Sequence, residues 1–392
     1  MKKIASIMIA VAFIGFNLCA QRSTSTRQAV KHLMELKKPK LSYDSSFSPE
    51  EFEAWQNKVT ETMGKLMKHP EKEIAEPIKI KTVKRNGYTV EKWLSFPTEG
   101  NIVPFLVLVP DGVDENHPAP AVLCIPGWGQ SKEMLAGEKI GNFELENDAD
   151  TTVSTRNMAR HMVENGFIAL AIDNPSCGEL SDNGNFDYLV TSRFLLENGW
   201  SYLGLSSWQD RVALNHLRNR DDVNKDRLIV SGFSLGTEPL MVLGALEPDI
   251  FAFVYNDILV RTRERILTVE KPDEKGVRPF PNTDEHLVPE FLNYFDFPDL
   301  VANLAPRPVI CTEGGMERDF DLITSAYEKR GDPSAFTTLK YYSDYPEYQR
   351  HDTIPGGINL GEFYSYLGVS PGHYFKVEKV IPWLKCVIAT EK

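Results

Sequence analysis

Gly232-Phe233-Ser234-Leu235-Gly236 is the stretch of this sequence that decides the fold. The β-branched run at 227–230 predicts a buried strand before it, and the apolar run at 239–246 predicts a helix after it. A G-x-S-x-G between strand and helix is typical of a nucleophile elbow, a strained turn that exposes a serine hydroxyl. Small residues at the glycine positions let strand and helix approach closely. The alternative is a tight turn that carries an ordinary surface serine.

Strands and helices alternate on both sides of this turn. Asn86-Gly87 predicts a hairpin between strands at 78–84 and 88–94, and a third strand is expected at 103–109. This order predicts an α/β fold with a mostly parallel central sheet, helices on both faces and antiparallel N-terminal strands. The further expected strands lie at 121–125, 167–172, 228–230, 251–255, 309–311 and 338–342, and the helices at 152–165, 205–217, 239–246, 321–329 and 375–388.

Composition divides the chain into three parts. Two lysines, an apolar run at 4–18 and Cys19-Ala20 predict a signal peptide over 1–20, and hence a periplasmic or secreted protein. Residues 21–75 are expected to form an N-terminal helical arm, and residues 76–392 the catalytic domain. Two long connections interrupt that domain, at 174–204 and 258–300, as expected of lids or substrate walls. We interpret the arginines of the second connection, Arg261, Arg263 and Arg265, as part of a solvated helix face, with a substrate clamp as the alternative.

Charge and cysteine spacing exclude several kinds of partner. The 392 residues carry a net charge of −12, which opposes binding to nucleic acid or to an anionic membrane surface. No internal stretch is long and apolar enough to span a bilayer. We expect no metal and no organic cofactor, because no Cys or His spacing is typical of a zinc site. Four cysteines remain after cleavage, without an indicated pairing, and nothing indicates the oligomeric state.

A serine nucleophile needs a base and an acid that orients it, here in the chain order serine, acid, histidine. His373 immediately precedes the C-terminal helix, so its loop can lie over the carboxyl edge of the sheet. It is our first choice as base. His351, which follows the last expected strand sooner, is the alternative, and His286 belongs to the 258–300 connection. Each of the three also fits a hydrogen-bonded surface imidazole.

The acid is expected after the strand at 309–311, where Gly314-Gly315 allows a tight bend. Glu317, just after that bend, is our first choice, with Asp319 and Glu313 as alternatives. Asp257, which follows the preceding strand, is a further candidate. Any of these acids also fits the first turn of a helix, where the helix dipole favours negative charge.

The tetrahedral intermediate of acyl transfer needs two amide donors. One is expected to be the N–H of Leu235, directly after the serine. The other is expected in the turn after the strand at 121–125, from Trp128 first and Gly129 second. Because backbone groups supply both bonds, the indole of Trp128 is left to form a pocket wall or to join the core.

Four segments together resemble the α/β-hydrolase superfamily over residues 78–390: 126–129 (PGWG), 173–181 (DNPSCGELS), the 232–236 turn and 294–308 (YFDFPDLVANLAPRP). The likeness is greatest to bacterial acetyl-xylan-esterase-like and dienelactone-hydrolase-like proteins. It implies an α/β-hydrolase fold and an exported serine carboxylesterase that deacylates, above all deacetylates, a polysaccharide or oligosaccharide through an acyl-enzyme. Two departures stand out: Pro126-Gly127 replaces the usual His-Gly, and a glutamate replaces the usual aspartate.

Two other functions remain open from the sequence. A prolyl-oligopeptidase-like serine peptidase uses the same order of catalytic residues, although no propeller-like repeats precede the catalytic region. A carbohydrate-binding pseudoenzyme, with a triad that no longer functions, belongs to a different class altogether.

Overall fold

The computed structural model describes residues 25–139, 154–182, 184–272, 274–276, 281–338, 353–367 and 372–390. The chain groups into two compact units, Met1–Lys40 and Leu41–Lys392. The first contains helix α2 (Thr26–Leu36), which Ser25 caps through a hydrogen bond from the Gln28 amide. The predicted signal peptide, 1–20, lies outside the described residues. No helix among the residues described has the length and apolar character needed to cross a bilayer.

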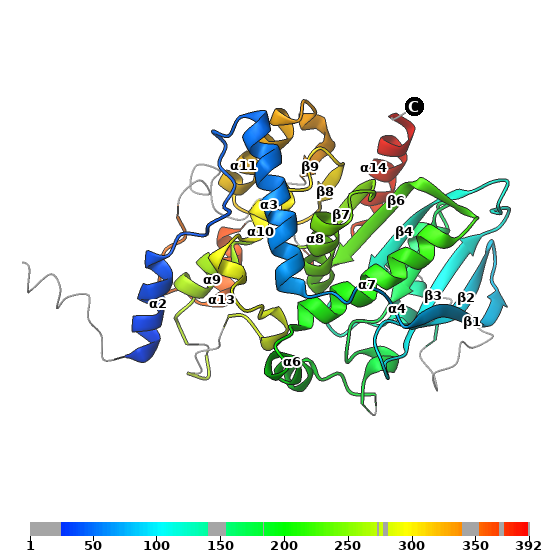
Figure 1. Cartoon of the computed structure of the whole chain (residues 1–392), viewed down its shortest axis with the longest axis horizontal. Coiled ribbons are helices and arrows are strands. Elements are labelled where there is room, and N and C mark those ends of the chain that lie inside the picture. Colours follow the sequence, from blue (N-terminus) through cyan, green and yellow to red (C-terminus); the bar gives the residue numbers. More distant parts are fainter. Residues whose placement is uncertain are drawn as a thin grey trace, which may run out of the picture. The chain divides into compact units, whose positions relative to one another are not determined.

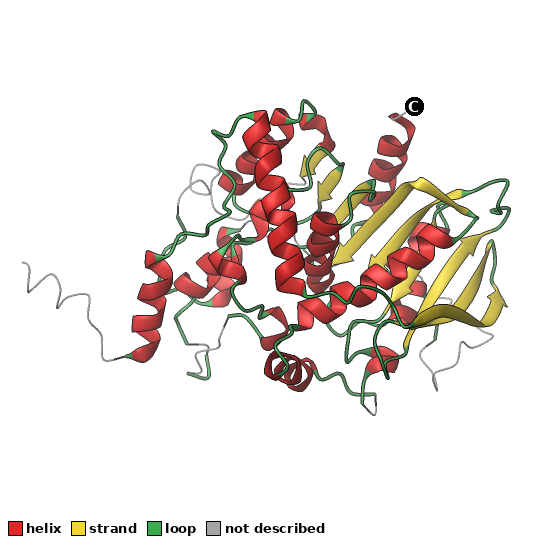
Figure 2. Ribbon diagram, in the orientation of Figure 1, coloured by secondary structure: helices red, strands yellow, loops and turns green. Residues whose placement is uncertain are grey.

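The second unit is built on a sheet whose strands have the order β1-β2-β3-β5-β4-β6-β7-β8-β9 (Figures 1 and 2). The pairs β1·β2, β2·β3 and β3·β5 are antiparallel, and all the others are parallel. The predicted α/β class and its antiparallel N-terminal strands are therefore confirmed. The strands are β1 (Ala75–Lys84), β2 (Tyr88–Phe96), β3 (Val103–Pro110), β4 (Ala119–Ile125), β5 (Ile168–Ile172), β6 (Val223–Phe233), β7 (Ala252–Asn256), β8 (Val309–Cys311) and β9 (Phe336–Thr338).

Helices cover both faces of the sheet because successive strand residues point to opposite sides. In β4, Ala121, Leu123 and Ile125 belong to one apolar core, while Val122 and Cys124 belong to the other. The first core is completed by α3 (Pro49–Met67), α7 (Tyr202–Asn219), α8 (Thr237–Leu246), α10 (Phe297–Ala302) and α11 (Glu317–Lys329). The second is completed by α4 (Lys132–Ala136), α5 (Met158–Val163) and α14 (Val377–Thr390).

Helix α3 belongs to the same compact unit as the sheet, although the sequence places it in an N-terminal arm. Its Phe52, Val59 and Met63 are fully buried. Its polar face is tied down as well, since the Thr60 hydroxyl donates to the carbonyl of Ala245 at 2.9 Å and Gln56 Nε2 donates to two carbonyls beside α10. The compact unit that contains the sheet therefore begins at Leu41 and includes α3.

The two long connections carry short helices of their own. The 174–204 connection contains α6 (Tyr188–Glu197), and the 258–300 connection contains α9 (Thr262–Thr268) before α10. A further helix, α13 (Leu360–Tyr366), lies between β9 and α14. The expected strand at 338–342 is described only to Thr338, as the end of β9, and its remainder lies outside the described residues. All four cysteines in the described part of the chain are free thiols.

Candidate active site

Ser234 stands at a sharp turn between strand β6 and helix α8. Its φ is +53°, the left-handed region that costs a serine about 1–3 kcal/mol. A Cβ added at Gly232 would lie 2.3 Å from the carbonyl oxygen of Gly236, and one added at Gly236 would lie 2.5 Å from that of Ile125. Only glycine therefore fits at these two positions. A side chain at Gly232 would clash with the turn itself, and one at Gly236 would clash with the end of β4. The local geometry is that of a nucleophile elbow.

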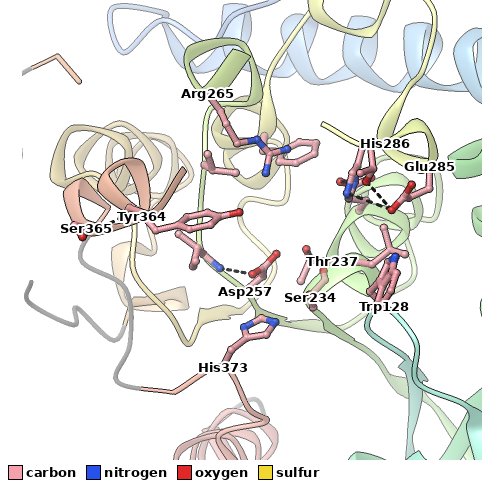
Figure 3. A pocket seen from close by; sticks show the side chains of 17 residues that line it. Trp128, Ser234, Thr237, Asp257, Arg265, Glu285, His286, Tyr364, Ser365 and His373 are labelled. Carbon is pink, nitrogen blue, oxygen red and sulfur yellow. Dashed lines mark hydrogen bonds and ion pairs between the residues drawn. The ribbon is translucent and has the colours of Figure 1, made fainter. Parts of the chain in front are cut away.

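His373 faces this turn from the loop that leads into α14. Its Nδ1 lies 3.0 Å from Glu313 Oε2, and its ring stacks on Phe233 with a centroid distance of 4.7 Å. Because Nδ1 is engaged with Glu313, Nε2 is the nitrogen left for Ser234. Both residues line one pocket and lie side by side in Figure 3. Both are described, and no hydrogen bond joins them, which is common before substrate binds.

Glu313 is held in place by groups from two other segments. Its side chain is fully buried, two residues beyond the end of β8. Asn256, the last residue of β7, donates from Nδ2 to Glu313 Oε1 at 3.1 Å and accepts from the amide of Lys376 at Oδ1. The Lys376 ammonium lies 3.4 Å from Glu313 Oε1. These contacts fix both the carboxylate and the loop that carries His373.

The acid against His373 is therefore Glu313, which the sequence ranked as an alternative, and not Glu317. Glu317 is the first residue of α11, beyond the glycine bend. That bend pairs with Leu259, whose amide donates to the carbonyl of Gly314 at 2.8 Å. The chain has therefore already passed His373 when it reaches Glu317. Asp319 is engaged elsewhere, 2.7 Å from Arg261 Nε.

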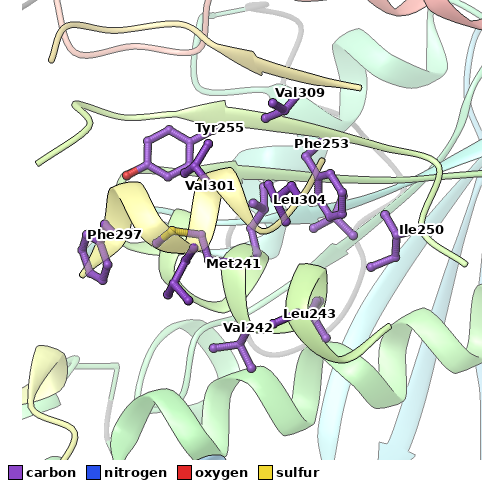
Figure 4. Packing of buried hydrophobic residues seen from close by; sticks show 14 of the residues in the cluster. Met241, Val242, Leu243, Ile250, Phe253, Tyr255, Phe297, Val301, Leu304 and Val309 are labelled. Atoms are coloured by element: carbon purple, nitrogen blue, oxygen red, sulfur yellow. The ribbon is translucent and has the colours of Figure 1, made fainter. Parts of the chain in front are cut away.

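Tightly packed apolar side chains support the ends of β7 and β8. Figure 4 shows Phe253 and Tyr255 of β7 in one apolar cluster with Met241 of α8 and Leu304, which follows α10. All four side chains are at most 1% exposed, so packing at the density of a protein interior leaves these strands little freedom to shift. Asn256 and Glu313 thus project from well-fixed strand ends.

Asp257 is the third ionisable group at His373. Ligand atoms of Asp257, Glu313 and His373 all lie within 4.8 Å of one another. Burial raises the pKa of Asp257 to about 6, against the lowering effect of the nearby His373. Burial lowers the pKa of His373, but the hydrogen bond with Glu313 and the charges of Asp257 and Glu313 outweigh it, so the pKa lies above its ordinary value.

These three residues also have the atoms to bind a metal ion. The same Nδ1 and carboxylate oxygen already form the His373–Glu313 hydrogen bond, so a cation there would replace that bond. The arrangement fits a histidine that is oriented by an acid without help from a metal.

We expect Asp257→Asn to move the acid limb of the kcat/KM profile to lower pH. His373 must be neutral to accept a proton, and the Asp257 carboxylate favours the imidazolium. Removing that charge therefore lowers the pKa of His373, and the limb should move by about half to one pH unit. The measurement is ester hydrolysis between pH 5 and 9, with Asp226→Asn, which removes an exposed charge far along β6, as control. A limb that stays in place or moves to higher pH would contradict this role.

The turn after β4 lies opposite the serine. The amide of Gly129 donates to the Tyr188 hydroxyl at 2.9 Å, and that of Gly127 donates to Gln130 Oε1 at 3.0 Å. In the part of the chain that the structure describes, no partner is found for the Trp128 amide. Leu235 is the second residue of a single 3₁₀ turn, Ser234–Gly236, and the first N–H groups of a helix lack partners within it. Trp128 and Leu235 are thus the two predicted donors with free amides, whereas Gly129 is occupied.

The 173–181 segment (DNPSCGELS) fixes the turn after β4 through hydrogen bonds. Asn174 Nδ2 donates to the carbonyl of Pro126 at 3.0 Å, and Asp173 accepts from both the amide and the ammonium of Lys132. Asp173 and Lys132 are both fully buried, so removing Lys132 would leave the Asp173 carboxylate uncompensated, whereas Lys132 also contacts Glu133 and Glu179. The sequence identifies this segment only through its resemblance to a family. Its structural role was not predicted, because that role depends on contacts between residues more than 40 positions apart.

The pocket around these groups has a volume of about 860 Å³. Its walls come from the 258–300 connection and α13, as well as from the sheet edge. Trp128 forms one wall with 54% of its surface exposed, and its ring packs edge-on against Phe186 at 4.6 Å. His286, a histidine of the 258–300 connection, lies in another wall, where its Nδ1 is 2.6 Å from Glu238. The alternative base, His351, lies outside the described residues.

Known proteins resemble this chain in sequence and in fold. The model of the Abhydrolase family matches residues 12–386. A crystal structure described as a candidate acetyl xylan esterase from Bacteroides fragilis is 41% identical, with 95% of this chain and 96% of that chain covered and a TM-score of 0.86. No curated protein matches the chain.

Two more distant structures share the fold alone. A glucuronoyl esterase from Solibacter usitatus is 13% identical, with 84% of this chain and 96% of that chain covered and a TM-score of 0.52. An acetyl xylan esterase from Paenibacillus sp. R4 is 14% identical, with 90% and 98% covered and a TM-score of 0.51.

Proposed function

This chain belongs to the Abhydrolase family, and from that premise we propose that it is an exported serine carboxylesterase that deacetylates an O-acylated polysaccharide or oligosaccharide. The observation that carries the proposal is the hydrogen bond between His373 and the buried Glu313, at the mouth of a pocket that also contains Ser234. The 41% identity to a candidate acetyl xylan esterase over nearly the whole chain supports the choice of ester.

The chemistry follows from the positions of these groups. Ser234 Oγ attacks the ester carbonyl, and His373 Nε2 takes its proton. Glu313 accepts the hydrogen bond from Nδ1–H and stabilises the imidazolium that forms. The imidazolium then protonates the leaving sugar oxygen, which releases the alcohol and leaves an acyl group on Ser234. A water molecule, activated by the same histidine, hydrolyses the acyl-enzyme.

The negative charge of the tetrahedral intermediate falls on the former carbonyl oxygen. We expect the amides of Leu235 and Trp128 to donate to it, and one such donor typically contributes about 10²- to 10³-fold in rate. The same turn brings the exposed Trp128 ring beside the reacting ester. A flat, apolar ring face at that point suits the carbon face of a sugar, while the remaining pocket volume exceeds what an acetyl group needs.

A panel of substrates tests the proposal. We expect the purified chain to release acetate from acetylated xylo-oligosaccharides and from a chromogenic acetyl ester, and not to cleave a proline-containing peptide. The measurements are acetate release and peptide mapping by mass spectrometry. Cleavage of the peptide without ester turnover would support a peptidase instead. Binding of the oligosaccharide without any turnover would support a non-catalytic carbohydrate-binding protein.

A further inference from the structure

Arg265 of helix α9 is a buried cation that lines the candidate active-site pocket. Only 9% of its surface is exposed, so it does not lie on the solvated helix face that the sequence suggested. Figure 3 shows its guanidinium reaching into the pocket from the side opposite His373, with Asp257 and Ser234 between the two. Its neighbour Arg261 has a different role, since it pairs with Asp319 at 2.7 Å.

The guanidinium of Arg265 has one neutral hydrogen-bond partner and no ion-pair partner among the described residues, although its charge acts on the nearby Asp257 carboxylate. Its Nη2 donates to Asn282 Oδ1, and its Nε is buried without a hydrogen-bond partner. Among the described residues, no carboxylate comes within ion-pair distance of it. Most of its donors are therefore open in a site that excludes much of the solvent.

The carboxylates on the neighbouring wall are engaged with other groups. Glu238 contacts His286 at 2.6 Å, and Glu285 accepts a hydrogen bond from the Thr283 hydroxyl at 2.6 Å. His286 also lies 4.0 Å from Glu285. Both carboxylates on that wall are engaged with other groups, whereas the guanidinium of Arg265 forms no ion pair with a described residue. The pocket thus presents one cationic point with unused donors.

A buried cation without a counter-ion is unfavourable for folding, so its persistence in a pocket indicates a ligand that completes it. The planar guanidinium matches a carboxylate through two parallel hydrogen bonds, a geometry that an ammonium group does not offer. We propose that Arg265 binds a free carboxylate on the substrate, so that the preferred substrates are esters that carry an acidic group near the scissile bond. This inference rests on the proposed esterase function and narrows its substrate class.

Two substrate designs carry such a carboxylate. In an acetylated uronic acid it belongs to the alcohol that leaves, and in a hemisuccinate ester of a neutral sugar it belongs to the acyl group. The experiment measures kcat and KM for both, beside the acetyl ester of the matching neutral sugar. We expect wild-type kcat/KM to be roughly 10- to 100-fold higher for at least one acidic ester, mainly through a lower KM. The ester with the advantage identifies which half of the substrate contacts Arg265.

Variants at this position separate recognition from a structural role. Arg265→Met keeps the length of the side chain and removes the charge, so the ratio of acidic to neutral kcat/KM should fall towards one. Arg265→Lys keeps the charge without the planar fork and should give an intermediate ratio. Arg156→Met, which removes an exposed arginine away from the pocket, should keep the wild-type ratio. Because Arg265 has no acidic partner, Arg265→Met should melt at or above the wild-type temperature.

Three results would overturn the inference: a wild-type enzyme with no preference for either acidic ester, a ratio that Arg265→Met leaves unchanged, or a lower melting temperature with equal loss for all esters. The last result would mean that Arg265 supports the fold. A binding measurement keeps this test separate from the proposed function. If no ester is hydrolysed, the esterase proposal fails, and calorimetry with glucuronate against glucose still tests Arg265. Stronger binding of glucuronate, lost in Arg265→Met, would support the carboxylate site, and equal binding would refute it.

Discussion

Ser234→Ala is expected to lower kcat for ester hydrolysis by about 10⁴- to 10⁶-fold, because the members of a catalytic triad act as a unit. The substitution removes only the oxygen that attacks, while the elbow and the pocket remain. Substrate binding should therefore change little, and the melting temperature should stay close to that of wild type, since alanine keeps the same left-handed backbone at this position. The measurements are kcat and KM for a chromogenic acetyl ester, together with a thermal melt.

The matched control for this prediction is Ser334→Ala, which removes the same atom from an exposed serine outside the pocket. It should leave kcat within about twofold of wild type, as surface substitutions usually do. If Ser234→Ala kept turnover within tenfold of the wild-type enzyme, Ser234 would not be the nucleophile. The reaction would then require another group in the pocket, such as a water molecule activated by His373.

The second large effect distinguishes two glutamates that lie four positions apart. Glu313→Gln should lower kcat by about 10⁴-fold, because an amide cannot hold the imidazole in the tautomer that accepts a proton from serine. Glu317→Gln should leave kcat within about threefold, since Glu317 begins α11 and Glu313 occupies the position against His373. Both side chains are buried, so both substitutions need a check on folding.

The comparison needs thermal melts of both variants, because Glu313→Gln also removes a carboxylate from beside the buried Lys376 ammonium. An unfolded Glu313→Gln would be replaced by Glu313→Asp, which keeps the charge and should recover part of the activity. A large loss in Glu317→Gln, with near-normal turnover in Glu313→Gln, would reverse our assignment. Strong activity in Glu313→Gln that disappears in the double variant with Asp257→Asn would instead make Asp257 the orienting acid.

The sequence identifies the parts of the site that depend on local patterns. The elbow needs a β-branched strand, two glycines and an apolar helix in succession, and all of these are contiguous. His373 is found because it directly precedes a helix in a chain order that the fold dictates. The sheet follows from the alternation of strands and helices, and the hairpin at Asn86-Gly87 from the turn preference of that pair.

The acid of the triad is harder to predict, because moving the end of strand β8 by a few residues changes which carboxylate lies beside His373. Strand β8 has only three residues, so the position where it ends decides which acid reaches the histidine. The sequence favoured the acid after the Gly314-Gly315 bend, whereas the bend itself is used to pair with Leu259. The acid before the bend, two residues past the strand, is the one that remains at the sheet edge.

The supporting residues lie beyond what local patterns can show. Asn256 joins Glu313, 57 positions away, to the backbone at Tyr374, 118 positions away. Such contacts arise only when the sheet brings distant strand ends together. Arg265 is similar, since its helix has the composition of an exposed segment and becomes buried only when the 258–300 connection folds over the pocket.

Covalent labelling of the native chain is the most direct test of the central claim, that the Ser234 hydroxyl is activated by His373. The measurement is peptide mapping by mass spectrometry after reaction with a fluorophosphonate, at pH values below and above the pKa of His373. We predict one adduct, on Ser234, that forms faster as His373 loses its proton and is lost in His373→Ala. An unlabelled Ser234, or an adduct of equal yield in His373→Ala, would contradict the account.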